Sequence, residues 1–294
     1  MPELRLDGVE SIQQALERVC AVCESELPAG IGESVAYALR GEGKRLRPLL
    51  LLEAYRACGG KGDASDLAAA VEVVHAYSLA HDDLPCMDDD DMRRGRPTLH
   101  RVFGVPAATV AGVVMVPLAA RCAWRASLAL ELSAEESGVI VRELMEASGA
   151  GGMVGGQWLD LEAEGARLGL EALAHVHRLK TGALIRASVT LAARAARASE
   201  RQLRALDTYG LAIGLAFQIA DDVLDVTASS AQLGKTAGRD EYLGKSTYPA
   251  LLGVEGAAGR ANELVDEGCE ALDKEGLLTP ALNHLARFSV ERRS

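Results

Sequence analysis

Apolar and polar positions follow a helical period along most of the chain. Residues 10–26 place apolar side chains three and four positions apart, which predicts an amphipathic helix. Residues 66–80 and 199–226 are expected to be long helices, the second capped by Ser199. Further helices are expected at 31–39, 49–58, 105–130, 134–148, 158–164 and 168–198, with two more after residue 245. No segment alternates convincingly as a strand would, so the pattern predicts ten or more helices in one all-α domain spanning residues 1–294.

Proline and glycine mark where these helices should end. Pro85 should end the helix of residues 66–80 near Leu84, because proline lacks an N–H and clashes with the preceding turn. Asp88 is therefore expected to return to Asp82 through a local loop. Loops are also expected at 41–48, 59–62, 95–104, 149–156 and 228–238. Glycines 149–156 are better explained by helix packing or a hinge than by a phosphate cradle, because no strand precedes them.

Composition narrows the class of protein. Aromatic residues make up 4% of the 294 residues, while Ala and Leu dominate, which favours packed helices. The net charge of −11 argues against a nucleic-acid partner, which would need a basic face. The six cysteines have no framework spacing and indicate reduced thiols in a cytoplasmic protein, so Cys20 and Cys23 are expected to serve packing.

The sequence indicates neither a signal peptide nor a membrane span. Residues 1–8 carry two acids and no apolar core. The longest apolar stretch, residues 105–120, contains Pro106 and Pro117 and is shorter than the roughly 20 residues that cross a bilayer. We therefore expect a fully buried core helix there.

Two acidic clusters, far apart in the sequence, each adjoin an apolar segment. The first places six carboxylates within residues 82–91, directly before Arg93 and Arg94. The second follows the apolar run 214–220 and consists of Asp221, Asp222 and Asp225. Carboxylates bind hard cations, and Arg and Lys bind phosphate oxygens. A polyphosphate that carries Mg²⁺ would satisfy both kinds of side chain.

Each cluster also has a simpler interpretation. Residues 88–91 could be a charged loop, and the second cluster could be a solvated helix face. However, Asp221 and Asp225 are one helical turn apart and repel each other on a helix that is apolar nearly all round. Because buried charges are paired or coordinate metals, a metal site is favoured at the second cluster.

Specific motifs are distributed along the chain: GEGKRLRP (41–48), HDDLPCMDDDDMRRGRP (81–97), GMVGGQWLDLEAEG (152–165), HRLKTGAL (177–184), GLAFQIADDVLDV (214–226) and LGKSTYPALLG (243–253). In this order they resemble the trans-isoprenyl diphosphate synthase, or polyprenyl synthetase, family, in its bacterial farnesyl diphosphate synthase branch. The resemblance implies a helical bundle around a deep central cavity, usually in a homodimer. It also implies head-to-tail condensation of isopentenyl diphosphate with dimethylallyl or geranyl diphosphate.

The resemblance assigns roles to named residues. Asp82 and Asp88 would ligate two of three Mg²⁺ ions and Asp221 would help with the third, with Asp83, Asp222 and Asp225 in support. The allylic diphosphate would be bound by Arg93, Lys180, Lys235 and Lys245, and isopentenyl diphosphate by Lys44, Arg47, His75 and Arg94. Thr181 and Gln218 would line the reacting allyl group. Taken singly, His75 could be a core histidine and Lys44 with Arg47 an exposed basic turn; His175 and His177 are interpreted as structural or surface residues.

Product length should depend on what blocks the cavity below Asp82. Tyr77 lies five residues earlier, about 7.5 Å deeper along a helix, and Ser78 lies one turn earlier. A bulky ring at position 77 resembles the pattern of farnesyl (C15) producers. Two positions depart from the family: Val113 stands where an aspartate is usual, and Pro117 should kink its helix.

Other functions remain open on the sequence. A geranylgeranyl diphosphate synthase would share every motif except the chain-length pattern. A non-catalytic partner subunit would lack one acidic motif, and a terpene cyclase would carry a different second motif. A calcium-binding module would need a twelve-residue loop that the sequence does not contain.

Overall fold

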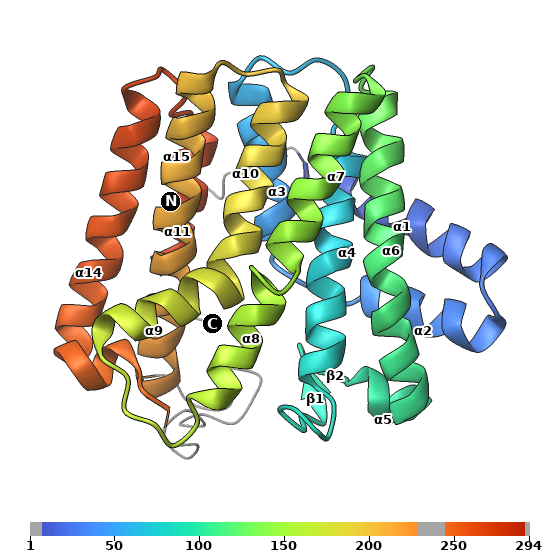
Figure 1. Ribbon diagram of the computed structural model, residues 1–294, viewed down its shortest axis with the longest axis horizontal. Coiled ribbons are helices and arrows are strands. Elements are labelled where there is room, and N and C mark those ends of the chain that lie inside the picture. Colours follow the sequence, from blue (N-terminus) through green and yellow to red (C-terminus); the bar gives the residue numbers. More distant parts are fainter. Residues whose placement is uncertain (1–7, 228–244, 292–294) are drawn as a thin grey trace. The chain divides into compact units, whose positions relative to one another are not determined.

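The computed structural model describes residues 8–227 and 245–291, which are almost entirely helical (Figure 1). The predicted all-α class is confirmed. The helices, in order, are α1 (Val9–Glu26), α2 (Ala29–Leu39), α3 (Leu46–Ala57), α4 (Ser65–Asp82), α5 (Leu99–Phe103), α6 (Val105–Ala129), α7 (Ala134–Ser148), α8 (Met153–Glu162), α9 (Leu170–His177), the π-helix η1 (Arg178–Gly182), α10 (Ala183–Ala195), α11 (Glu200–Thr227), α14 (Tyr248–Asp273) and α15 (Pro280–Glu291). The strands are β1 (Met92–Arg93) and β2 (Arg96–Pro97).

The chain forms two compact units. Unit 1 comprises Met1–Leu52 and Lys61–Val141, and unit 2 comprises Glu53–Gly60 and Arg142–Ser294. Unit 1 therefore carries the first acidic cluster and unit 2 the second. The prediction of one domain, and of a central cavity shared by both clusters, stays a prediction.

Helix α4 is the core of unit 1. Its residues from Leu67 to Val74 are all at most 2% exposed, because the helix is apolar on nearly every side. It packs along α6 and also contacts α1 and α2 (Figure 1). Gly112 of α6 lies so close to His81 that a Cβ there would stand 2.0 Å from the imidazole, so glycine sets the close approach of the two helices.

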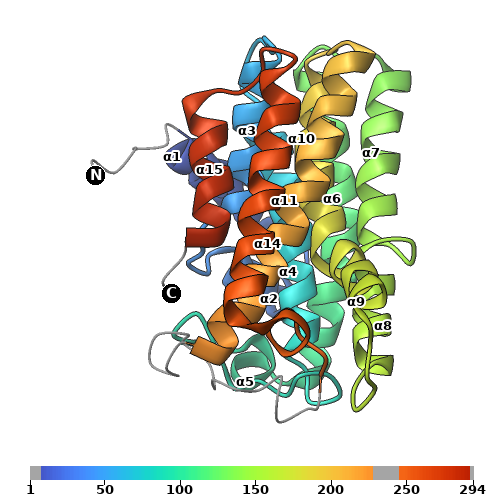
Figure 2. The ribbon, with the colours of Figure 1, turned by 90° about the vertical axis from the view of Figure 1, so that its left-hand side faces the viewer.

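Helix α11 forms the core of unit 2, as α4 does in unit 1, and it packs against α10 and α14 (Figure 2). Ser199 caps it as predicted: the backbone N–H of Gln202 donates to Ser199 Oγ at 3.3 Å, and Ser199 N–H donates back to Gln202 Oε1 at 2.9 Å. Tyr209 is fully buried and donates its hydroxyl to the carbonyl of Leu282 at 2.8 Å, which ties α11 to α15.

The expectation that no strand occurs is wrong at residues 92–97. Met92 pairs with Pro97 and Arg93 with Arg96, leaving Arg94 and Gly95 as a two-residue loop. Both loop residues have positive φ, 54° and 74°, which is the geometry that matches the twist of a tight hairpin. Residues 95–104 were predicted to be a loop because they are polar, so the second strand and the turn lie partly inside that expected loop.

Other boundaries also differ from the predictions. Helix α5 occupies part of the expected loop 95–104, and α8 begins inside the glycine-rich segment. The continuous helix expected over 168–198 starts at Leu170 and is interrupted by the π-helix η1. Cys20 and Cys23 are buried in α1, and burial raises the pKa of Cys20 to about 12, which agrees with the predicted packing role.

Helix α6 is not fully buried, contrary to the prediction. It runs unbroken through Pro117, and one face exposes four large apolar side chains: Val110, Val113, Trp124 and Leu128. Among the described residues it is the one helix whose length and composition would suffice to cross a membrane. Small residues on its opposite face, such as Ala108 and Ala119, pack in the core of unit 1.

Candidate active site

The first acidic motif lies where α4 ends. The helix ends at Asp82, and the following loop returns at once, because Asp88 N–H donates to the carbonyl of Asp82 at 2.8 Å. The loop is also closed by a hydrogen bond from Asp89 N–H to the carbonyl of Leu84 at 3.1 Å. The predicted local return of Asp88 to Asp82 is confirmed.

Asp83 has a different environment from its neighbours. It is 3% exposed and accepts two hydrogen bonds from Arg93, at 2.9 Å from Nε and 2.5 Å from a terminal nitrogen. Arg93 also pairs with Asp90 at 3.0 Å. Burial raises the pKa of Asp83, while the Arg93 guanidinium acts in the opposite direction. Asp83 thus restrains the arginine that is predicted to bind the allylic diphosphate.

A buried ion pair supports the basic loop of residues 41–45, just before α3. Arg45 has a positive φ of 49°, and its side chain turns inward to Glu72 at 2.5 Å, with only 8% and 3% of the two side chains exposed. Arg45 also donates to the carbonyls of Gly41 at 2.7 Å and Leu39 at 3.2 Å. These bonds tie the loop to α4, while the neighbouring Lys44 is exposed.

Three of the residues predicted to bind isopentenyl diphosphate meet at His75. Its Nε2 lies 3.4 Å from Arg47 and 3.2 Å from Arg94. Burial, and then the two guanidinium groups, lower the pKa of His75 well below its ordinary value. A neutral imidazole can accept from both arginines, so it holds two cations together without adding a third charge. His75 is therefore more than a histidine packed in the core, because two arginines contact its ring.

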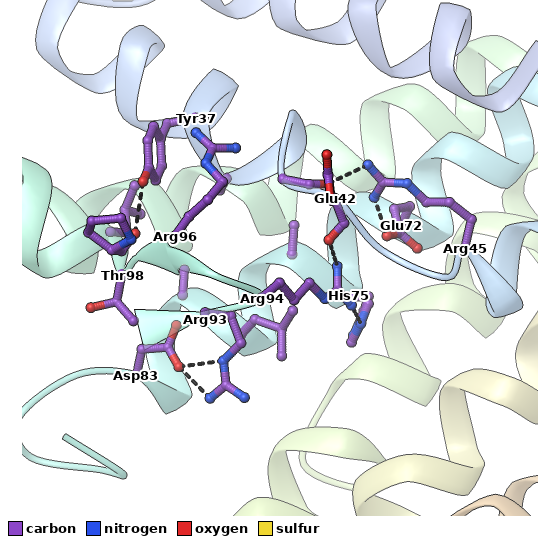
Figure 3. Close-up of a pocket in the computed structure, with 17 residues that line it drawn as sticks. Tyr37, Glu42, Arg45, Glu72, His75, Asp83, Arg93, Arg94, Arg96 and Thr98 are labelled. Carbon is purple, nitrogen blue, oxygen red and sulfur yellow. Dashed lines mark hydrogen bonds and ion pairs between the residues drawn. The ribbon is translucent and has the colours of Figure 1, made fainter. Parts of the chain in front are cut away.

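These residues lie beside a pocket of about 70 Å³ in unit 1 (Figure 3). His75, Arg93 and Arg94 are among its lining residues, as are Tyr37 and Arg96. Arg96 lies 4.1 Å from the centroid of the Tyr37 ring, and the Tyr37 hydroxyl donates to the carbonyl of Pro97 at 2.8 Å. Arg94 donates to the carbonyl of Glu42 at 3.0 Å, so the hairpin and the basic loop are joined there.

In unit 2, Asp222 of α11 is held entirely by protein groups. It is 3% exposed, accepts from the backbone N–H of Tyr248 at 3.0 Å, and lies 3.2 Å from His177 Nε2. Its other oxygen lies 3.5 Å from the Gln218 amide nitrogen. Asp222 therefore fits the supporting role rather than that of a direct metal ligand. Asp225 is also buried, whereas Asp221 is partly exposed.

The π-helix η1 carries Lys180 and Thr181, and single-turn π-helices recur at functional sites. Thr181 donates its hydroxyl to Gln218 Oε1 at 2.7 Å, which links η1 to the second acidic motif. Glycines allow this approach: a Cβ on Gly214 would meet Gly182 at 2.7 Å, and one on Gly156 would meet the Lys180 nitrogen at 2.1 Å. The packing role predicted for the glycine-rich segment agrees with Gly156.

Asp160 is a candidate site residue that the sequence reasoning missed. Its Oδ2 accepts from Lys180 Nζ at 2.7 Å and from Lys245 Nζ at 2.8 Å, so it joins two of the cations predicted to bind the allylic diphosphate. It lies within the quoted motif GMVGGQWLDLEAEG, four residues after Gly156, but no periodicity distinguishes it from its neighbours. Lys235, assigned to the same substrate, lies outside the described residues.

Tyr77 and Ser78 lie on the side of α4 that meets α6. The Tyr77 ring contacts the edge of the His81 ring, with centroids 5.0 Å apart. His81 Nε2 lies 3.1 Å from the carbonyl of Thr109, which anchors the pair to α6. Ser78 donates to the carbonyl of His75 at 2.9 Å within its own helix.

The donor set fits magnesium better than a metal that prefers nitrogen or sulfur. Asp82 and Asp88 offer carboxylate oxygens in unit 1, and Asp221 offers them in unit 2; such oxygens are the ligands of hard cations. Among the residues that the structure describes, no three His, Cys, Asp or Glu side chains are grouped so as to hold a metal by themselves. Mg²⁺ commonly binds through one or two carboxylates together with substrate phosphates, so this arrangement suits an ion that arrives with a diphosphate.

Known proteins resemble the chain over nearly its full length. The family model described as "Polyprenyl synthetase" matches residues 28–278. Farnesyl diphosphate synthase of Escherichia coli K12 is 46% identical over 289 residues, 97% of this chain and 96% of its own. A chloroplastic geranylgeranyl pyrophosphate synthase of Catharanthus roseus is 42% identical over 94% of this chain and 78% of its own. A geranyltransferase structure from Legionella pneumophila superposes with a TM-score of 0.85 at 33% identity, covering 97% of this chain and 95% of that one.

Proposed function

Because the chain belongs to the polyprenyl synthetase family, we propose that it condenses isopentenyl diphosphate with dimethylallyl or geranyl diphosphate and releases farnesyl diphosphate and pyrophosphate. The observation that carries this proposal is that basic side chains gather in the same unit as each acidic motif. Arg47, Arg94 and the neutral His75 lie together in unit 1, and Lys180 and Lys245 lie together in unit 2. A diphosphate matches both groups in charge and in hydrogen-bonding capacity.

We propose that the two substrates are bound by different cations. Arg93, Lys180 and Lys245, together with Lys235, would bind the allylic diphosphate. Lys44, Arg47, His75 and Arg94 would bind isopentenyl diphosphate. Asp82, Asp88 and Asp221 would hold the Mg²⁺ ions, three per site by family resemblance, with Asp83, Asp222 and Asp225 holding neighbouring groups in place. When bound, magnesium neutralises the charge that develops on the leaving diphosphate.

In the proposed reaction, the bond between allylic C1 and the diphosphate oxygen breaks, and C1 bonds to C4 of isopentenyl diphosphate. The Thr181 hydroxyl donates a hydrogen bond to Gln218 Oε1, so the lone pairs of the threonine oxygen can face the allylic cation and stabilise it. His75 keeps Arg47 and Arg94 on the second diphosphate and so positions the attacking double bond. The departing pyrophosphate would accept the proton that is lost in the last step.

The exposed apolar face of α6 supports a homodimer. Val110, Val113, Trp124 and Leu128 are each at least 38% exposed on one helix, which is unfavourable unless another surface covers them. We propose that a second copy of the chain covers this face, and that the dimer acts in the cytoplasm.

An assay of the purified protein tests the reaction. With isopentenyl diphosphate, geranyl diphosphate and Mg²⁺, we expect a C15 diphosphate, and we expect activity to stop on addition of excess EDTA and to return with Mg²⁺. Chromatography of the products separates the alternatives: cyclic hydrocarbons would indicate a terpene cyclase, and no turnover with any allylic primer would indicate a binding subunit.

Product length tests the role proposed for Tyr77. Truncation in Tyr77→Ala removes the ring below Asp82, so we expect the variant to produce C20 or longer diphosphates, as a geranylgeranyl diphosphate synthase does. Tyr77→Phe, which keeps the ring, is the matched control and should retain the C15 product. If Tyr77→Ala still released only C15 diphosphate, the chain-length assignment would be wrong.

A further inference from the structure

The carboxylate of Asp160 joins two cations that come from distant parts of the sequence. One oxygen, Oδ2, accepts from Lys180 Nζ at 2.7 Å and from Lys245 Nζ at 2.8 Å. Lys180 comes from η1, and Lys245 comes from the segment before α14. Two ammonium groups that share one oxygen lie close together, and without an anion between them they would repel each other.

The three side chains are shielded from water, which strengthens their interaction. Asp160, Lys180 and Lys245 expose 17%, 27% and 12% of their side chains. Although burial pushes the pKa of Asp160 upward, the two lysines lower it to about 2, so the carboxylate is charged at neutral pH. Glu164 forms an ion pair with Lys245 at 3.6 Å and none with Lys180 among the described residues, and its side chain is 37% exposed.

The backbone sets this arrangement. Asp160 lies one helical turn beyond Gly156 on α8, and Gly156 contacts the backbone of Lys180. Any side chain at position 156 would push η1 away from α8. The glycine therefore places the Asp160 carboxylate within reach of the lysine on the neighbouring element.

We propose that Asp160 is a positioning residue for the allylic diphosphate, holding the ammonium groups of Lys180 and Lys245 side by side before the ligand binds. This inference rests on the proposed function, which assigns those lysines to the diphosphate. Each ammonium has three N–H donors, so the bond to Asp160 does not use all the donors of either lysine. The three side chains together carry one net positive charge, so a diphosphate is still attracted.

The test compares Asp160→Asn with Glu164→Gln, which removes the same charge from an acid that pairs with Lys245 rather than with both lysines. In Asp160→Asn, we expect the KM for geranyl diphosphate and the Kd for inorganic pyrophosphate with Mg²⁺ to rise about tenfold, because preorganisation is lost. The KM for isopentenyl diphosphate should stay unchanged, since its predicted ligands lie in unit 1. Glu164→Gln should change both constants less than about twofold, because the pair is long and partly exposed.

Asp160→Glu keeps the charge but moves it by one methylene, so its affinity for pyrophosphate should lie between those of the wild type and Asp160→Asn. If Asp160→Asn does not fold, the affinity of Asp160→Glu still shows whether the position of the carboxylate matters. Unchanged pyrophosphate binding in Asp160→Asn would overturn the inference, because the carboxylate would then make no contribution to binding. Tighter binding would also overturn it, because the carboxylate would then compete with the ligand for the lysines. An equal rise in both KM values would also overturn it. If the wild-type protein neither bound pyrophosphate nor turned over, the proposed function would fail instead.

Discussion

Alanine at Asp82 or at Asp221 is expected to lower kcat by about a thousandfold or more, because either change removes a carboxylate proposed to hold magnesium on the leaving diphosphate. Both residues are partly exposed and lie at or near the end of a helix, so their loss should leave the fold intact. Steady-state turnover measures the effect, and circular dichroism shows whether the helices persist. The two residues belong to different units, so a loss of activity at both would show that one reaction needs both motifs.

Asp89→Asn is the matched control for the first motif. Asp89 is an exposed acid in the same run of carboxylates, and its φ of 50° is a conformation that asparagine tolerates. We expect its activity to remain within about threefold of wild type, because a nearby exposed charge contributes little. Full activity in Asp82→Ala or Asp221→Ala would contradict the proposed metal ligands.

The largest effect on stability is expected at Glu72. In Glu72→Gln, the Arg45 guanidinium stays buried without a counter-charge, so the free energy of unfolding should fall by about 3–5 kcal/mol. The KM for isopentenyl diphosphate should also rise, because Arg45 ties the basic loop of residues 41–45 to Glu72 of α4. Urea unfolding followed by circular dichroism measures the first effect, and steady-state kinetics measure the second.

Glu26→Gln provides the comparison for an exposed pair. Glu26 meets Arg121 at 2.6 Å, but 48% and 40% of their side chains are exposed, so its loss should cost no more than about 1 kcal/mol. Equal losses of stability in Glu26→Gln and Glu72→Gln would mean that the buried pair does not anchor the loop.

The limits of prediction from the chain are clear at particular elements. The end of α4 and the return of Asp88 could be predicted, because Pro85 acts on its immediate neighbours. The hairpin at 92–97 could not, because its turn depends on a positive φ at Arg94 that the residue type does not favour. The burial of α6 was overestimated for a related reason: an apolar composition predicts that a surface will be covered, but not which part of the molecule covers it.

The amino-acid order alone determined the all-α class and the position of both acidic motifs, because those follow from local periodicity and from short motifs. It also singled out, by resemblance to a family, most of the charged residues that are proposed here for the site. Only the folded chain decided which partners those charges have. His75 lies between two arginines, Asp222 faces Tyr248 and His177, and Asp160 joins two lysines. Such contacts join residues 19 to 85 positions apart, where helix packing through glycines, rather than any local pattern, sets the distance.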